Sequence, residues 1–259
     1  MHDTVNLRAL PFAALTETQT VNEIMRCRET GGGGWVSTPN THQLDLITRH
    51  GELRSLVESA SLIVADGMPL VWASALQGTP LPERVAGSNL VWSLARAAAD
   101  EGASLFLLGG DAGVARRAKL TLEREVPGLR VVGAHSPPFG FESNPAEISR
   151  IREQLQAARP DFVYVGLGFP KQELLIRELT ECLPETWFLG VGISLSFISG
   201  DRSRAPAWMQ RLGLEWVHRL WLEPSRLFRR YLVDGVPFTV GLLLRCGVTR
   251  VKAPAYPLR

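Results

Sequence analysis

Cysteine is scarce in this chain, and the short motifs that commonly hold a metal ion are absent. Three cysteines occur among 259 residues, at positions 27, 182 and 246. Thiols so far apart in sequence argue against a disulfide framework and favour a reducing compartment. The chain contains no CxxC, HExxH or DxD sequence. We therefore expect neither a metal site nor a cofactor, and any diphosphate that the protein handles must be neutralised by arginines and helix dipoles.

Long apolar runs are also missing. No uninterrupted apolar stretch reaches the ~18–20 residues that a membrane span requires. The nearest approach, residues 236–248, is shorter and contains Arg245. The N-terminus shows no basic segment followed by an apolar one, so we expect no secretory signal. These absences favour a protein located in the cytoplasm.

Charge is distributed unevenly along the chain. Residues 202–259 hold ten Arg and one Lys against three acidic residues, a balance of +8, whereas residues 1–201 carry −6. The basic segment also contains Trp208, Trp216 and Trp221. A basic, aromatic-rich helix suits an anionic membrane surface, although a solvated basic face is the usual fate of arginines. We expect two parts, an α/β catalytic domain at 1–200 and a helical, membrane-associating appendage at 201–259, and no nucleic-acid partner.

Short apolar runs alternate with helical patterns up to Gly200. The runs predict strands at 34–38, 62–65, 104–108, 129–134, 162–166 and 187–192. The patterns between them predict helices at 41–58, 69–77, 88–101, 113–125, 145–158 and 171–181. This alternation indicates a Rossmann-like α/β fold, with a mostly parallel sheet covered by helices on both faces. Ligands of such sheets bind beyond the carboxyl ends of the strands.

Polar residues follow two of these strands at the point where each strand ends. Asp66 comes directly after the apolar run LIVA and precedes Gly67, so its carboxylate could act as a general base or cap the next helix. Thr38 and Asn40 follow the first predicted strand. Their side chains suit sugar hydroxyls, and capping of the next helix is the alternative.

Two glycine-containing loops could bind a phosphate. In GLGFPKQE, Gly168 precedes a helix that opens near Lys171 and offers free backbone N–H groups. In GGDAG, Gly109 and Gly110 follow a predicted strand. This second loop lacks the GxGxxG spacing of a dinucleotide site, and a plain tight turn is its simpler interpretation.

Six blocks of the sequence resemble, in order, those of the TagA/WecG/CpsF glycosyltransferases. They are TPNTHQLDLI, VADGMPLVWASALQGTPLPERVAGSNL, FLLGGDAGVARRA, PDFVYVGLGFPKQE, GVGISLSFISG and RAPAWMQRLGLEWVHRLWLEPSRLFRRYL. The resemblance implies an inverting, metal-independent transferase that uses a UDP-sugar donor. It further implies an acceptor sugar on a polyprenyl diphosphate, and a peripheral location on the inner face of the bacterial plasma membrane.

The same resemblance implies roles for individual residues. Asp66 matches the general base, and Thr38 with Asn40 matches a sugar-contacting pair. Arg84 and Gln172 match an active-site arginine and glutamine. Arginines of an appendage that closes over the site are matched by Arg219, Arg226 and Arg229.

One block departs from the family pattern. Members that transfer N-acetylmannosamine commonly read GVGGSFDF, whereas here Ile193 stands for a glycine and Ser196 for the aspartate. The changed loop belongs to the nucleotide-sugar end of the family's site. We therefore expect these two residues to shape donor choice and favour glucose, as in the GumM-like branch of exopolysaccharide glucosyltransferases. N-acetylmannosamine is the alternative.

Two other classes of protein compete with a transferase. An NAD(P)-dependent oxidoreductase shares the fold but would need a GxGxxG loop. A non-catalytic membrane adaptor would leave the polar residues at the strand ends without a purpose. The sequence leaves the oligomeric state, the acceptor's sugar and the polysaccharide pathway open.

Overall fold

A computed structural model describes residues 2–211 and 213–252, without the side chains of 207, 211, 226 and 249–252. The chain begins with an antiparallel hairpin of β1 (Thr4–Leu7) and β2 (Leu10–Ala13), followed by α1 (Glu17–Glu29). Neither the hairpin nor α1 is predicted above. Both are short or mostly polar elements, yet α1 has a clear start signal, since Thr16 and Gln19 form a reciprocal capping box.

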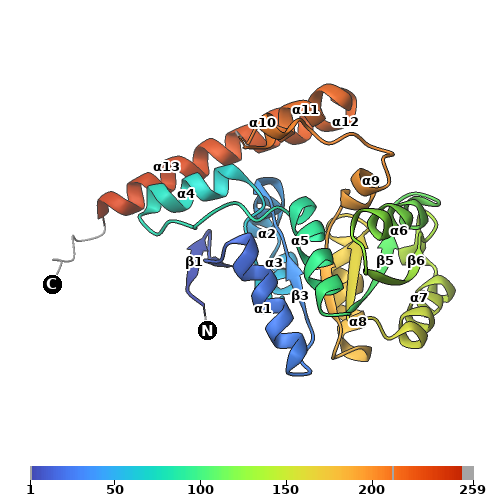
Figure 1. Ribbon diagram of the computed structural model, residues 1–259. Helices are drawn as coiled ribbons and strands as arrows, with labels where there is room; N and C mark the ends of the chain where they lie inside the picture. Colours follow the sequence, from blue (N-terminus) through green and yellow to red (C-terminus); the bar gives the residue numbers. More distant parts are fainter. Residues whose placement is uncertain (1, 212, 253–259) are drawn as a thin grey trace.

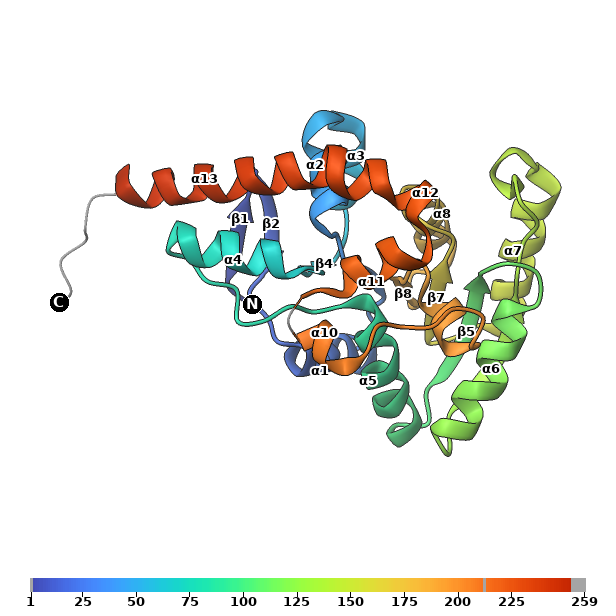
Figure 2. The same ribbon diagram turned by 90° about the horizontal axis from the view of Figure 1, so that it is seen from above.

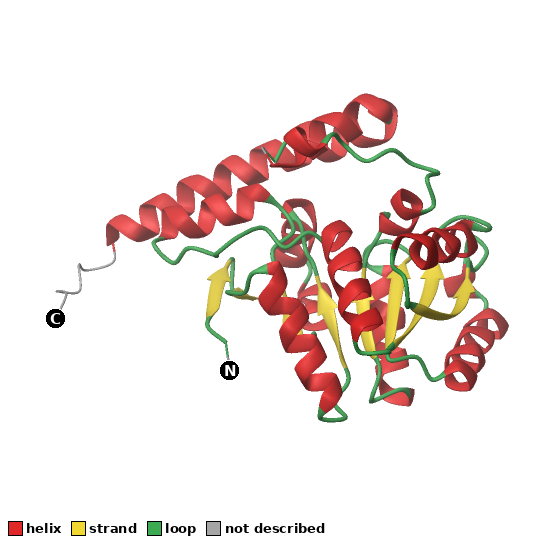
Figure 3. Cartoon of the chain, in the orientation of Figure 1, coloured by secondary structure: helices red, strands yellow, loops and turns green. Residues whose placement is uncertain are grey.

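Six strands form one parallel sheet, which confirms the predicted fold class (Figure 3). Their order across the sheet is β4-β3-β8-β7-β5-β6. The strands are β3 (Gly34–Ser37), β4 (Leu62–Ile63), β5 (Ser104–Gly109), β6 (Arg130–His135), β7 (Phe162–Gly166) and β8 (Trp187–Gly190). The chain builds outward from β3 to β4, and separately outward from β5 to β6, before β7 and β8 fill the middle. The carboxyl ends of β3, β8 and β7 therefore meet at a point where the strand order reverses, the usual ligand position in such sheets.

Helices cover both faces of the sheet (Figure 1). The helices of the body are α2 (Thr41–Arg49), α3 (Gly51–Glu58), α4 (Met68–Gln77), α5 (Gly87–Asp100), α6 (Val114–Glu125), η1 (Phe141–Ser143), α7 (Pro145–Ala158), α8 (Lys171–Cys182) and α9 (Ser194–Ile198). The predicted helix 41–58 is two helices, because the backbone of His50 is extended between them.

The core divides according to the alternation of strand side chains. Leu105 and Leu107 pack with α1, α5 and α6 on one face, whereas Phe106 and Leu108 pack with α7 and α8 on the other. The hairpin, α2 and α4 form a third apolar cluster at the β4 edge. This arrangement is what the nearly continuous apolar strands predict, since both faces of a parallel sheet are buried.

After α9 the described chain is helical, and this C-terminal arm (residues 202–252) lies beyond the ends toward which the strands point (Figures 1 and 3). It comprises α10 (Ala207–Arg211), α11 (Glu215–Leu222), α12 (Pro224–Phe228), the π-helical η2 (Arg229–Gly235) and α13 (Val236–Lys252). Two views show α13 running alongside α4 (Figures 1 and 2). Leu242 and Cys246 are buried there in the same apolar cluster as Leu70 and Ala73 of α4.

The stretch Arg229–Val248 is long and apolar enough, by length and composition, to cross a membrane. The search for uninterrupted apolar runs did not find this stretch, because Asp234 and Arg245 interrupt it. In the structure η2 and α13 follow each other directly and form one continuous helix.

Candidate active site

The carboxyl end of the sheet places Asp66 two residues before α4. Buried Val64 and Ala65 continue the line of β4, and the Asp66 N–H donates to the Pro39 carbonyl at 3.2 Å. Helix α4 has Gly67 at its N-cap and no side-chain cap. The capping alternative for Asp66 is therefore wrong, and its half-buried carboxylate is available for other chemistry.

The surroundings of Asp66 shift the pKa of its carboxyl. Burial above all, together with the Glu215 carboxylate, raises the pKa of its carboxyl, and the net value is about 6. Arg84, Arg204 and a hydrogen bond with the Gly87 backbone oppose this rise. A general base works best with a pKa near the pH at which it operates, because it is then ionised and still basic enough to take a proton.

Two arginines and one glutamate surround this carboxylate. Arg84 Nη1 lies 3.5 Å from Glu215 Oε2, and Arg204 Nε lies 3.2 Å from Glu215 Oε1. Arg204 Nη1 also donates to the Ser88 carbonyl at 3.3 Å, while its Nη2 is buried with no hydrogen-bond partner among the described residues. An unused guanidinium donor near Asp66 can donate a hydrogen bond to an oxygen of a substrate.

The other two strand-end residues have different local roles. Thr38 Oγ1 donates to the Gly190 carbonyl at 3.4 Å and lies against Gly87, where an added Cβ would approach it to 3.1 Å. Thr38 therefore lies beside the residue whose backbone binds Asp66. Asn40 caps α2, because its Oδ1 accepts from the Gln43 N–H at 3.1 Å. The capping interpretation is right for Asn40, and its contact with a sugar stays a prediction.

Gln172 is buried and holds two loops together. Its Oε1 accepts from the Gly168 N–H at 3.2 Å and from the Gly192 N–H at 3.1 Å. Its Nε2 donates to Glu173 Oε1 at 2.8 Å. Glu173 is equally buried, its Oε2 has no partner among the described residues, and burial raises the pKa of its carboxyl to about 7.

The glycine loops converge on the same end of the sheet. Gly109 has φ +127°, and a Cβ there would come within 2.4 Å of the Gly166 carbonyl oxygen, so only glycine fits. Gly110 N–H donates to that carbonyl at 2.9 Å, and Gly168 has φ +81°. Lys171 pairs with Glu142 and lies 5.3 Å from the Phe139 ring centre, which turns it toward η1.

The donor-loop candidates belong to α9. Ile193 is its N-cap residue, and half-buried Ser196 lies within its only full turn. The Ser196 carbonyl accepts from the Arg202 N–H at 3.1 Å. This contact joins α9 to the start of the C-terminal arm.

The arm arginines named by resemblance are not the charges that act most on Asp66. Arg219 is half-buried on α11, and Arg229 is exposed at the start of η2. Arg226 belongs to α12, but its side chain lies outside the described part of the chain. Sequence reasoning missed Arg204 and Glu215, although both stand in the quoted block RAPAWMQRLGLEW. It also missed Glu173, which ends the FPKQE motif.

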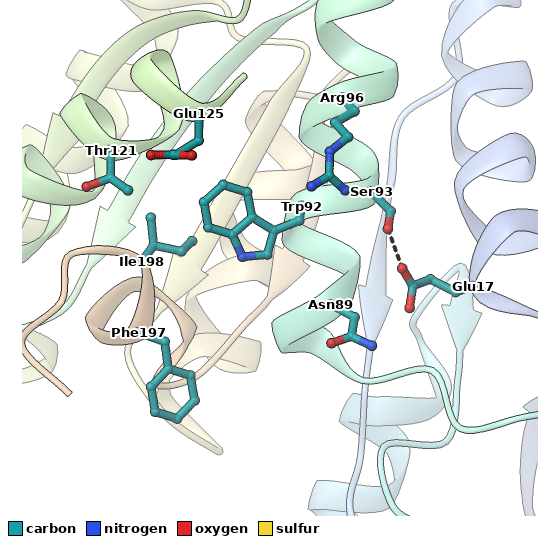
Figure 4. Close-up of a pocket in the computed structure, with 9 residues that line it drawn as sticks. All are labelled: Glu17, Asn89, Trp92, Ser93, Arg96, Thr121, Glu125, Phe197 and Ile198. Atoms are coloured by element: carbon teal, nitrogen blue, oxygen red, sulfur yellow. Dashed lines mark hydrogen bonds between the residues drawn. The ribbon is translucent and has the colours of Figure 1, made fainter. Parts of the chain in front are cut away.

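A groove of about 590 Å³ lies away from Asp66, between α1, α5, α6 and α9 (Figure 4). Trp92 points into it, Phe197 borders it, and Ser93 Oγ hydrogen-bonds to Glu17 at its edge (Figure 4). None of the residues predicted above to bind substrate lines this groove. The candidate site therefore rests on the strand ends and the arm.

Comparisons with known proteins show the family of this chain. A protein-family model described as the glycosyl transferase WecG/TagA/CpsF family matches residues 5–252. Among similar proteins, one from Bacillus spizizenii is 30% identical over 200 residues, which cover 77% of this chain and 75% of the relative. One from Bacillus subtilis is 29% identical over 80% of this chain and 79% of its own. One from Staphylococcus aureus is 29% identical over 87% of both chains. All three are named as N-acetylglucosaminyldiphosphoundecaprenol N-acetyl-β-D-mannosaminyltransferases.

Proposed function

Because the chain belongs to the WecG/TagA/CpsF family of glycosyltransferases, we propose that it transfers N-acetylmannosamine from UDP to the N-acetylglucosamine of a polyprenyl diphosphate. The protein is an enzyme of glycosyl transfer, and the two substrates are the proposal. The observation that carries it is the shared name of relatives that this chain matches over at least three quarters of both lengths.

The proposed donor is the alternative that the sequence left open. Relatives that match most of this chain are named for N-acetylmannosamine, and none of those cited is named for glucose. Ile193 and Ser196 remain the observation in favour of glucose. Ser196 of α9 stands where the family pattern has an aspartate, so a charged hydrogen-bond acceptor is missing there. Both donors therefore enter the test.

The chemistry follows from the position of Asp66. An acceptor hydroxyl gives its proton to the Asp66 carboxylate while its oxygen attacks the anomeric carbon of the donor. The bond from that carbon to the UDP oxygen breaks on the opposite side, so the configuration inverts and UDP leaves with the bonding electron pair. Arg84 and Arg204 act electrostatically on Asp66, and guanidinium groups this close to the base could stabilise negative charge on the substrates, which is usually the largest catalytic contribution.

The charge of the diphosphate requires further cations. Arg219, which is half-buried, and Arg229, which is exposed, both belong to the arm and can supply positive charge. The opening of α8 at Lys171 adds a helix N-terminus without a side-chain cap. These groups offer neutralisation without a metal ion.

The acceptor's lipid places the reaction at a membrane surface. The arm exposes Trp208, Trp221 and Phe228, whose exposed fractions are 59%, 82% and 54%. Aromatic side chains among arginines suit the boundary between headgroups and acyl chains. We propose that the enzyme acts at the cytoplasmic face of the plasma membrane, with the aromatic and basic side chains of the arm against the lipid.

A donor competition tests the proposal. The full-length enzyme is given a short-chain prenyl-diphosphate N-acetylglucosamine with equal amounts of UDP-N-acetylmannosamine and UDP-glucose, and products are identified by mass spectrometry. We expect the N-acetylmannosamine product to dominate. A dominant glucose product would contradict the proposed donor. In that case Ile193→Gly with Ser196→Asp should shift the donor preference toward UDP-N-acetylmannosamine.

A further inference from the structure

Glu215 joins three parts of the chain that are distant in sequence. It is the first residue of α11, and its carboxylate contacts Arg84 from the loop before α5 and Arg204 from the segment after α9. All three side chains are mostly buried, with exposed fractions of 16%, 13% and 20%. Charges in a mostly buried ion pair are screened by water and salt much less than charges on the surface.

A second contact seats the same part of the arm beside the base. Gly213, two residues before Glu215, has φ +71°, and a Cβ there would come within 2.6 Å of Met68 Cγ. Met68 opens α4 immediately after Asp66 and Gly67. The arm therefore approaches the Asp66 loop so closely that only glycine fits at position 213.

The charges around Asp66 are balanced only because Glu215 is present. Two guanidinium groups act on Asp66, together with one carboxylate and the backbone of Gly87. Without Glu215, both arginines would be free to pair with Asp66. A carboxylate held by two arginines is a weak base, because an opposite charge close by lowers its pKa.

We propose that Glu215 is a positioning residue, which binds Arg84 and Arg204 and so fastens the arm over Asp66 while keeping both arginines from pairing with the base. The proposal rests on Asp66 acting as the base of the transfer described above. Glu215 itself touches no reacting atom. It acts through the two arginines that it orients.

The test compares Glu215→Gln with Glu223→Gln in the full-length protein. Glu223 is a matched control, because it also belongs to the arm and pairs with an arginine, Arg202, at 3.2 Å. Two measurements are made on each variant: the pH dependence of kcat/KM, and a ¹³C NMR titration of the Asp66 carboxyl without substrates, assigned through Asp66→Asn. Thermal unfolding shows that each variant is folded.

We expect Glu215→Gln to move the acidic limb of the pH profile and the Asp66 titration together to lower pH, by about half a unit or more. We also expect kcat/KM at pH 8 to fall about tenfold or more, because the arginines are no longer oriented. Glu223→Gln should change neither titration.

Two results would overturn the proposal. In the first, the Asp66 titration in Glu215→Gln stays where it is or moves to higher pH. In the second, Glu223→Gln shifts it equally. If the wild type transfers no sugar from any donor, the proposed function fails, whereas the NMR titration still decides whether Glu215 controls Asp66.

Discussion

Asp66 lies at the end of a strand, and its carboxyl has a raised pKa. The variant Asp66→Asn tests whether this carboxyl is the base of the transfer. The substitution keeps the shape of the side chain and removes the base, so kcat should fall about 10²–10⁴-fold. Wild-type kcat/KM should also fall as pH drops below about 6, since the carboxyl is then protonated.

The control for Asp66→Asn is donor binding, measured by calorimetry, which should be unchanged. Burial disfavours the ionised carboxylate, so the variant should be no less stable than wild type at pH 7. Turnover close to that of wild type would remove Asp66 from the role of base.

The buried Glu173 carboxyl lowers the free energy of unfolding by an amount that depends on pH. In the folded protein the pKa of its carboxyl is about 7, above the ordinary value of 4.5. The free energy of unfolding therefore decreases as pH rises from 4.5 to 7, and the full loss is reached above pH 7. Relative to wild type, Glu173→Gln should therefore gain unfolding free energy between pH 4 and pH 8, by about 3 kcal/mol at most.

Denaturant unfolding at the two pH values measures the gain for Glu173→Gln. Gln at 173 keeps an oxygen that can accept from Gln172 Nε2. The exposed Glu153→Gln on α7 serves as the control and should show a much smaller difference. Equal pH dependence in both variants would contradict the burial of an ionisable carboxyl at position 173.

At the scale of elements, α13 has one face that packs against the protein and one apolar face that is exposed. Leu242 and Cys246 pack inward, whereas Val236, Val240, Leu244 and Val248 are exposed at a spacing of four residues and share the outer face. Trp72 and Leu76 of α4 are also exposed, and α4 runs alongside α13. We interpret the outer face as the surface that meets lipid.

Val240→Ser with Leu244→Ser should weaken binding to phosphatidylglycerol vesicles, because burial of apolar area at the interface is lost. The expected loss is about tenfold or more in a flotation assay. Leu120→Ser on α6 is the matched control, since Leu120 is 61% exposed and lies on the body. An equal loss in the control would show that vesicle binding does not depend on α13.

The arm arginines should act on the reaction and not only on lipid. Arg219→Ala with Arg229→Ala should lower kcat/KM with a water-soluble, short-chain acceptor, for which membrane docking is irrelevant, by about 10²-fold. The paired control is Arg124→Ala with Arg150→Ala, two exposed arginines of α6 and α7. If both double variants retain full activity with the soluble acceptor, Arg219 and Arg229 belong to a lipid-facing patch.

At the scale of the whole molecule, charge on the diphosphate is expected to be neutralised by the protein itself. Among the described residues, no three His, Cys, Asp or Glu side chains gather in a way that could hold a metal ion. If arginines carry the neutralisation as proposed, EDTA should leave the transfer rate unchanged, as measured by UDP release. Activity that disappears with EDTA and returns with Mg²⁺ or Mn²⁺ would contradict this prediction.

Much of the body could be predicted from the sequence because buried parallel strands leave an unmistakable apolar pattern. All six strands of the large sheet were predicted, and Asp66 was found because it directly follows one of them. The hairpin of β1 and β2 was missed, since four-residue strands with mixed polarity carry little signal.

The partners of Asp66 were only partly predictable. Arg84 was identified by resemblance, but its pairing with Glu215 joins residues 131 positions apart. Such a contact depends on how the arm folds back, which no local pattern encodes. Gln172 was likewise identified, whereas its three hydrogen bonds became visible only when two loops and Glu173 were placed around it.

Helix α4 connects Asp66, the proposed base, to helix α13 of the arm. It begins two residues after Asp66 and packs along its length against α13. If α13 rests on lipid as proposed, this pair of helices sets a fixed height of the Asp66 carboxylate above the bilayer. That height would determine which hydroxyl of the acceptor can reach Asp66. A hydroxyl on the first sugar of the lipid would reach the base, while the terminal hydroxyl of a longer glycan would stand beyond it, so addition would stop after one sugar.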